Sequence, residues 1–165
     1  MNNFQWVIER PPDSFSVPLA AFALHNGHKI RSELTPFLAI DEDHRLREED
    51  PFTGNLTEIA ETHVIVNVSR FEVDLNRPRE KAVYRKPEDA WGLKVWKTGL
   101  PGPIVERSLE LHDKFYRDAY ELLKSLEDKF GRFIVLDLHS YCHQRNGPDA
   151  PFDSPQANPD INLGT

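Results

Sequence analysis

The stretch FIVLDLHSYCHQRNG, residues 133–147, decides the fold class, because it leads an apolar run directly into polar side chains. The run from Phe133 to Leu138 has the length and continuity of a buried strand in a parallel sheet. Ligands of open α/β sheets bind beyond the carboxyl ends of such strands. His139 is therefore the first candidate site residue, and Asp137 is either its hydrogen-bond partner or a carboxylate at the sheet edge.

A second apolar run, residues 17–24, ends in the same way, with His25 and His28 behind it. Parallel strands of one sheet have their carboxyl ends at a common edge. Histidines from two strands are therefore expected to meet at one rim of the sheet.

Between these strands the chain predicts a helix and a further strand. Residues 104–130 repeat apolar side chains at three- and four-residue intervals and end at Gly131, which indicates a long amphipathic helix. Residues 63–68 are rich in β-branched side chains, which favour a strand. Helix and following strand form half of a βαβ unit, so the expected class is α/β. Elsewhere we expect an extended lead-in at residues 1–15, short helices and loops at 27–50, and the start of another strand at 161–163.

The composition excludes several classes of function. A chain of 165 residues with 39% hydrophobic and 28% charged residues is expected to form a single domain over residues 1–165. Its net charge of -7 disfavours a nucleic-acid binder, which needs a basic face. No apolar stretch approaches the roughly 20 residues of a membrane span, and the N-terminus lacks a signal-peptide layout. The single Cys142 allows no internal disulfide. We therefore expect a cytoplasmic protein without nucleic-acid or membrane partners.

The histidines suggest a metal site. His25 and His28 stand three residues apart, which brings two imidazoles to one metal if the turn begins a helix. Hydrolytic zinc sites use three protein ligands and leave one position open for water. His139 and a carboxylate of the acidic run 48–50 would complete such a set. The alternative is a loop with polar side chains and an acidic run on a solvated face.

A second polar segment, SRFEVDLNRPR at residues 69–79, follows the strand at 63–68. The planar fork of an arginine pairs bidentately with a carboxylate, so Arg70, Arg77 and Arg79 suit an anionic substrate. The alternative is that these arginines form ion pairs with carboxylates of their own neighbourhood, Glu72, Asp74 and Glu80.

Four motifs occur in order: LHNGH (24–28), EEDPFTG (48–54), SRFEVDLNRPR (69–79) and, after the long helix, LDLHS (136–140). In this combination the chain resembles the N-formylglutamate amidohydrolase family over residues 17–165. That family is similar in fold to zinc carboxypeptidases and aspartoacylases. The resemblance implies a phosphorylase/hydrolase-like α/β fold, with a mixed, mostly parallel sheet flanked by helices and one zinc ion at the carboxyl ends of the strands.

The resemblance also implies the zinc ligands. They are His25, His139 and an acidic residue, for which Asp50 fits best. Glu49 and His28 remain rivals for the same position, because carboxypeptidases place a glutamate where this chain has His28.

For the substrate, the resemblance implies that Asn76 and Arg77 bind its free carboxylate and that Arg70 polarises the scissile carbonyl. The expected reaction is zinc-dependent hydrolysis of an N-acyl amino acid, first of all N-formyl-L-glutamate to formate and L-glutamate. Family members carry further strands and a general-base glutamate beyond the position of Thr165. The chain is therefore expected to be the N-terminal portion of the family domain.

Two alternatives to this function remain open. One is a zinc carboxypeptidase-like peptidase or another deacylase that uses the same ligands. The other is a non-enzymatic domain that binds an anion or a partner protein, in which His25, His28 and His139 are structural. Metal content separates the second alternative from the enzymes.

Overall fold

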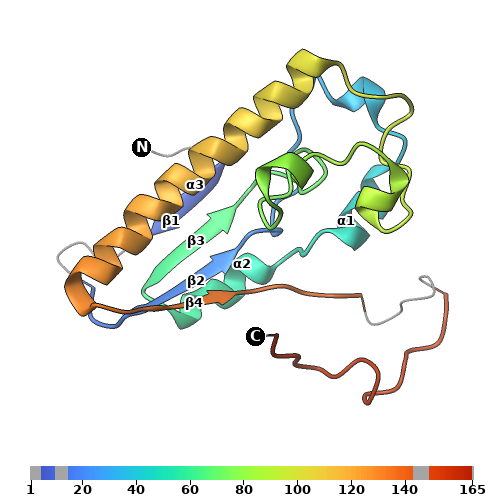
Figure 1. Ribbon diagram of the computed structural model, residues 1–165. Coiled ribbons are helices and arrows are strands. Elements are labelled where there is room, and N and C mark those ends of the chain that lie inside the picture. The colour runs from blue at the N-terminus through green and yellow to red at the C-terminus, as the bar shows by residue number, and fades with distance from the viewer. Residues whose placement is uncertain (1–4, 10–14, 143–148, 165) are drawn as a thin grey trace.

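The centre of the computed structural model, which describes residues 5–9, 15–142 and 149–164, is a four-stranded sheet in the order β1-β3-β2-β4 (Figure 1). β2 pairs in parallel with β3 and with β4, whereas β1 is antiparallel to β3. The fold is therefore α/β with a mixed, mostly parallel sheet, as the resemblance implied. The strands are β1 (Trp6–Glu9), β2 (Leu19–Ala23), β3 (Thr62–Val66) and β4 (Ile134–Asp137).

Helices cover both faces of the sheet. The predicted long helix is α3 (Gly102–Phe130), and it ends at Gly131, which adopts a positive φ of 73°. Side chains alternate between the faces of a strand. One face, with Phe22 and Val64, packs against the apolar stripe of α3. On the other face, Gly54 of the short helix α2 (Thr53–Leu56) lies against Ile65, and the 3-10 turn η2 (Thr57–Ile59) follows.

A second hydrophobic cluster lies apart from the sheet core and includes Phe71, Tyr84 and Trp96. It supports the segments that surround the carboxyl ends of the strands. Short elements predominate there, as predicted for residues 27–50, and they are η1 (Thr35–Phe37), α1 (Glu42–Glu48), η3 (Arg79–Lys81) and η4 (Pro87–Ala90).

Part of the expected lead-in is wrong, because residues 6–9 form β1. Trp6 opposes Val66 on β3, is 3% exposed, and donates a hydrogen bond from its indole nitrogen to Asp118 of α3 (3.1 Å). A four-residue edge strand gives too short a periodicity to be recognised in the sequence. The prolines Pro11 and Pro12 lie outside the described residues.

Strand β4, which lies within the apolar run at residues 133–138, was expected to be buried but is largely exposed. β4 pairs only with β2 in the described part of the chain, and Ile134 is 61% exposed. A continuous apolar run in the sequence is therefore also compatible with a strand at the edge of the sheet. The strand expected at residues 161–163 is wrong as well, since this stretch has no strand assignment and Ile161 and Leu163 are exposed.

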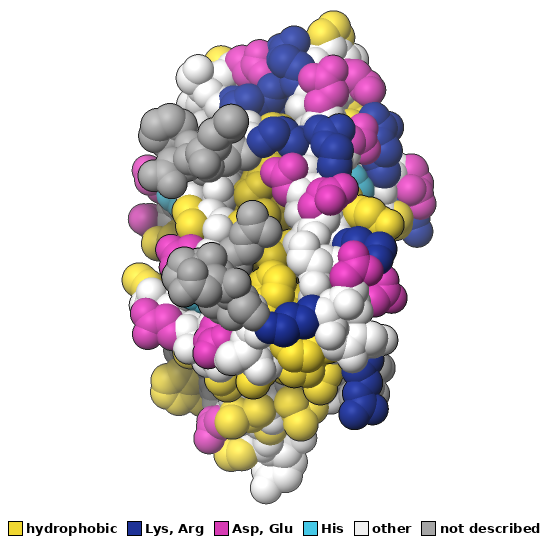
Figure 2. All heavy atoms as spheres, turned by 90° about the vertical axis from the view of Figure 1, so that its left-hand side faces the viewer, with side chains coloured by type: hydrophobic (Ala, Val, Ile, Leu, Met, Phe, Trp, Pro, Cys, Tyr) yellow, Lys and Arg dark blue, Asp and Glu magenta, His cyan; other side chains and the backbone are white. Residues whose placement is uncertain are grey.

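On the face shown in Figure 2, acidic and basic side chains intermix in the upper part, and hydrophobic side chains gather below them. No single sign of charge dominates this face. None of the described helices combines the length and the hydropathy that crossing a bilayer requires.

The packing of α3 predicts a large effect of Leu126→Ala. Leu126 is fully buried, so its loss leaves a cavity and should lower the free energy of unfolding by about 2 to 5 kcal/mol. Urea denaturation measures the change. Leu56→Ala, at a position 58% exposed, is the matched control and should change stability far less.

Candidate metal centre and active site

The register between β2 and β4 brings two predicted histidines together. Phe22 stands opposite Asp137, and the amide of Leu138 donates to the carbonyl of Phe22 (2.8 Å). His25 and His139, which follow these strands, therefore emerge at the same edge. Their Nδ1 atoms lie 3.2 Å apart.

Asp50 joins the two histidines from the segment after α1. Its backbone amide donates to the carbonyl of His25 (3.0 Å), which fixes the approach of the chain. Its Oδ2 lies 2.7 Å from Nδ1 of His139 and 3.4 Å from Nδ1 of His25. Three residues on three separate segments thus direct donor atoms at one point.

A carboxylate also lies at the far nitrogen of each imidazole. Nε2 of His25 donates to Asp74 Oδ1 (2.7 Å), and Nε2 of His139 lies 2.9 Å from Asp137 Oδ2. Metal-ligating histidines commonly have such partners, which fix the ring and its tautomer. Two imidazole nitrogens and one carboxylate oxygen form a donor set that zinc takes in catalytic sites. The residues therefore fit the metal that the family resemblance implies.

The charges of the cluster favour a cation at its centre. Hydrogen bonds to Asp137 and Asp50 raise the pKa of His139 to about 9. Burial raises the pKa of Asp50, but hydrogen bonds from His139 and His25 outweigh it and hold that pKa below its usual range. The carboxylate of Asp50 is therefore ionised and available as a ligand.

Asp74 is the hub of a buried network behind His25. It is 0% exposed, and besides His25 it accepts hydrogen bonds from the Tyr84 hydroxyl and from Arg70 Nη2 (3.1 Å). Burial raises the pKa of Asp74, but the hydrogen bonds and charges of His25 and Arg70 hold it well below its usual range. Burial and the negative charge of Asp74 raise the pKa of Tyr84, so this hydroxyl remains a donor.

Arg70 is held in place on several sides. Its Nε donates to the Tyr84 hydroxyl (3.2 Å), and its guanidinium carbon lies 4.7 Å from the centre of the Trp91 ring. Trp91 itself has a left-handed backbone (φ 43°) and donates from its indole nitrogen to Glu48 (3.0 Å). The orientation of Arg70 is therefore fixed by Asp74, Tyr84 and Trp91 together.

The rivals of Asp50 lie in a separate group. Glu49 accepts hydrogen bonds from Ser69 Oγ and pairs with His28 Nδ1. A metal held by His25 and His28 on one helix is excluded, because no helix starts at this turn. The chain instead runs beside residues 67–69 as an extension of the sheet, and the amide of Lys29 donates to the carbonyl of Asn67 (3.0 Å).

The other predicted residues divide between the site and the surface. Asn76 Nδ2 lies 3.2 Å from Nε2 of His139, and Arg77 Nε lies 3.6 Å from Asp74 with 40% of the side chain exposed. Arg79 binds Asp113 (2.8 Å) and Glu106 on α3 and lies away from the cluster. The ion-pair interpretation is thus right for Arg70 and Arg77, and in the described part of the chain their carboxylate partner is Asp74.

The sequence reasoning missed Asp74 as a site residue, along with Tyr84 and Trp91. Asp74 belongs to the motif SRFEVDLNRPR at residues 69–79, and its place beside Asn76 and Arg77 could have marked it as a site residue. The two aromatic residues stand outside every motif, so only the fold reveals them.

A hollow of about 380 Å³ opens beside the cluster. Asp50, Arg70, Arg77 and Trp91 line one side of it, and Ser140 and Tyr141, which follow β4, line the other. This size is sufficient for a small ligand.

The model of the N-formylglutamate amidohydrolase family matches residues 17–165. The chain belongs to this family. The crystal structure of N-formylglutamate amidohydrolase from Ralstonia eutropha JMP134 is similar, with a TM-score of 0.68 and 16% sequence identity. The match covers 86% of this chain and 58% of that one, so this family member spans little more than half the length of its structural neighbour. A search of curated proteins found no match.

The network around Asp74 predicts the effect of Tyr84→Phe. The change removes one donor from a buried carboxylate, so it should lower the free energy of unfolding by about 1 to 3 kcal/mol. Denaturant unfolding measures this difference. Tyr120→Phe on the exposed side of α3 is the control, and an equal effect of both substitutions would argue against the network.

Proposed function

We propose that this protein is a zinc-dependent amidohydrolase that acts on N-acyl amino acids, first of all on N-formyl-L-glutamate, which it hydrolyses to formate and L-glutamate. The observation that carries the proposal is the convergence of His25, Asp50 and His139 beside a hollow whose lining includes Arg70 and Arg77. Membership in the N-formylglutamate amidohydrolase family supports the reaction.

His25, Asp50 and His139 would hold the metal ion, and Asp74 and Asp137 would orient the two imidazoles. A bound zinc ion supplies Lewis acidity, which lowers the pKa of water and polarises a carbonyl group. The buried hydrogen bond from Nε2 of His25 to Asp74 would leave Nδ1 of His25 as the atom that holds the ion.

Arg70 would stabilise the negative charge that develops on the scissile carbonyl oxygen. A preorganised cation is most effective at this task when its position needs no adjustment during the reaction. The contacts to Asp74, Tyr84 and Trp91 provide this fixed position. They also offset part of the desolvation free energy of the largely buried Arg70 guanidinium.

Arg77 and Asn76 would bind the free carboxylate of the substrate. The guanidinium of Arg77 is only partly occupied by Asp74 and faces the hollow, so its planar fork can accept a second carboxylate. The Asn76 amide lies beside His139, which would keep that carboxylate close to the metal ligands.

Proton transfer calls for a further group. The buried carboxylates along the hollow are engaged in the described structure, Glu49 with His28 and Ser69, and Asp50 with the histidines. The family resemblance places the general-base glutamate in the later part of the family domain. We therefore assign metal and substrate binding, and not the proton transfer, to the residues named above.

Metal content tests the proposal. Protein purified without chelator should contain about one zinc per chain, and His139→Ala should lose it because one of three ligands is gone. His28→Ala is the matched control and should retain the metal. Elemental analysis measures the content, and stoichiometric zinc in His139→Ala would remove this residue from the ligand set. Formate release from N-formyl-L-glutamate, with and without chelation, then tests the reaction.

Arg77→Ala tests the carboxylate site. Zinc should stay bound, while binding of L-glutamate should weaken by about 1.5 to 3 kcal/mol, because a charge-assisted contact is lost. Isothermal titration calorimetry measures both affinities. Arg79→Ala removes an arginine paired on α3 and should bind L-glutamate like the parent chain.

A further inference from the structure

We propose that His112 and Tyr116 of α3 are positioning residues, which hold Asn76 and Arg77 in the geometry that binds the carboxylate of a substrate. The inference rests on the proposed function and deepens it, because it names the groups outside the hollow that fix its carboxylate site. The family match does not assign a role to either residue.

Both side chains donate hydrogen bonds to the backbone of the segment that carries Asn76 and Arg77. Nε2 of His112 lies 2.9 Å from the carbonyl oxygen of Arg77, and because a carbonyl oxygen only accepts, the imidazole is the donor. The Tyr116 hydroxyl donates to the carbonyl of Leu75 (2.8 Å). The two hydrogen bonds therefore hold the backbone on either side of Asn76.

The helix α3 presents the two rings as a pair. His112 and Tyr116 are four residues apart on one face of the helix, and their rings stack with centroids 4.5 Å apart. His112 is 6% exposed, and burial of an imidazole is unfavourable unless its nitrogen is hydrogen-bonded. Partial burial and the charges of Asp137 and Asp74 raise the pKa of Tyr116, so its hydroxyl remains a donor. Both donors are thus available to the segment at all times near neutral pH.

The amide groups of the same segment are satisfied by Asp74. The amide of Asn76 donates to Asp74 Oδ1 (3.0 Å), and the amide of Arg77 donates to the Asp74 carbonyl (3.2 Å). The side chain of Leu75 is buried in the sheet core against α3. Amides, carbonyls and the apolar side chain of this segment are therefore all engaged, while the Arg77 side chain lines the hollow.

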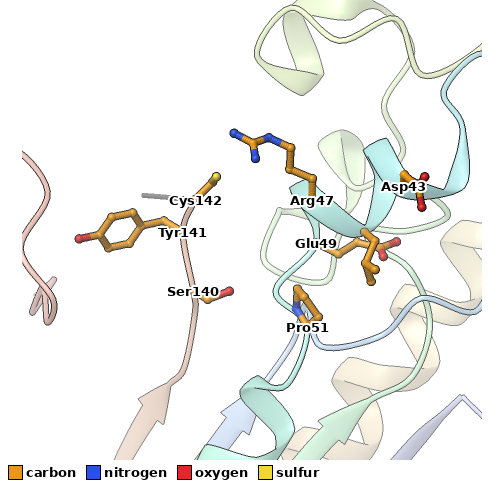
Figure 3. Close-up of a pocket in the computed structure, with 8 residues that line it drawn as sticks. Asp43, Arg47, Glu49, Pro51, Ser140, Tyr141 and Cys142 are labelled. Carbon is orange, nitrogen blue, oxygen red and sulfur yellow. The ribbon is translucent and has the colours of Figure 1, made fainter. Parts of the chain in front are cut away.

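The two residues of α3 lie outside the space that a ligand would occupy. The hollow that Arg77 lines adjoins a second one of about 420 Å³, since Glu49 and Ser140 belong to the lining of both. Figure 3 shows Ser140, on the segment after β4, across this space from Glu49. Among the described residues that line the two hollows, none belongs to α3. His112 and Tyr116 therefore act on a ligand only through the segment that they hold.

A further link between this part of the chain and α3 is weaker. Arg79 forms ion pairs with Asp113 and Glu106, but all three side chains are largely exposed. Ion pairs at such exposure contribute little, because water and salt screen them. The hydrogen bonds of His112 and Tyr116 are therefore the contacts of α3 that determine the position of the segment.

A double-mutant cycle tests whether His112 acts through Arg77. Isothermal titration calorimetry on the zinc-loaded chain measures the affinity for L-glutamate. His112→Leu, which removes the donor at similar volume, should weaken binding by about 3- to 10-fold, whereas His112→Gln keeps an N–H donor and should retain most of the affinity. Arg77→Ala keeps the carbonyl to which His112 donates but removes the guanidinium. In that background His112→Leu should weaken binding by less than about 2-fold further.

Tyr116→Phe is the second variant, because it keeps the stacked ring and removes only the hydroxyl. It should also weaken L-glutamate binding by about 3- to 10-fold, and again by less than about 2-fold when Arg77→Ala is already present. Tyr120→Phe, one turn further along α3 at an exposed position, is the matched control and should bind like the parent chain. Elemental analysis should find the parent's zinc content in every variant.

The outcomes separate this inference from the proposed function. Unchanged affinity in His112→Leu and Tyr116→Phe, or an equal loss with and without Arg77→Ala, would disprove the positioning role while the carboxylate site stands. Loss of zinc together with L-glutamate binding would show a general disturbance of the site and would disprove the role as well. If the parent chain binds no L-glutamate, or Arg77→Ala binds it equally well, the proposed carboxylate site fails, and the positioning role fails with it.

Discussion

The buried carboxylate of Asp74 is the constraint on which the rest of the site depends. An ionised group at 0% exposure is stable only when its hydrogen-bonding capacity is satisfied, and here His25, Arg70 and Tyr84 satisfy it. Each partner comes from a different part of the chain and has a different task. One network therefore fixes a proposed metal ligand, an arginine beside the hollow, and the segment between them. Its loss would disturb fold and site together.

The sheet explains why these groups meet. β2 and β4 run in parallel, so their carboxyl ends deliver His25 and His139 to a common edge. The polar loops around this edge cannot pack against the sheet core, and a second hydrophobic cluster supports them instead. Tyr84 belongs to that cluster through its ring and to the site through its hydroxyl. Packing of the Tyr84 ring in the second hydrophobic cluster thus holds the Tyr84 hydroxyl in its position beside Asp74.

The sequence predicted the strands after which the histidines lie, because continuous apolar runs and a helical period of apolar residues are strong signals. It could not predict that β1 pairs in antiparallel or that β4 lies at the edge, since both depend on which segments cover which face. Among the rival ligands, sequence reasoning could rank Asp50 first but could not separate it from Glu49. The structure separates their positions, because adjacent residues point to different partners, Glu49 to His28 and Asp50 to His139. Tyr84 and Trp91 lie near the site only through tertiary contacts that no local pattern encodes.

The position of Gly27 has a consequence for how readily the proposed site would bind a metal ion. A Cβ atom at this position would lie 2.1 Å from the backbone of Asn67, so the turn after His25 touches the chain that leads to Arg70 and Asp74. The two segments are also joined by a hydrogen bond from the amide of Lys29 to the carbonyl of Asn67 (3.0 Å). His25, the proposed ligand, and Asp74, the carboxylate that supports it, are thus held together by this packing and by their own hydrogen bond without an ion. Little conformational entropy remains to be lost on binding, and preorganisation of this kind raises affinity without adding a contact.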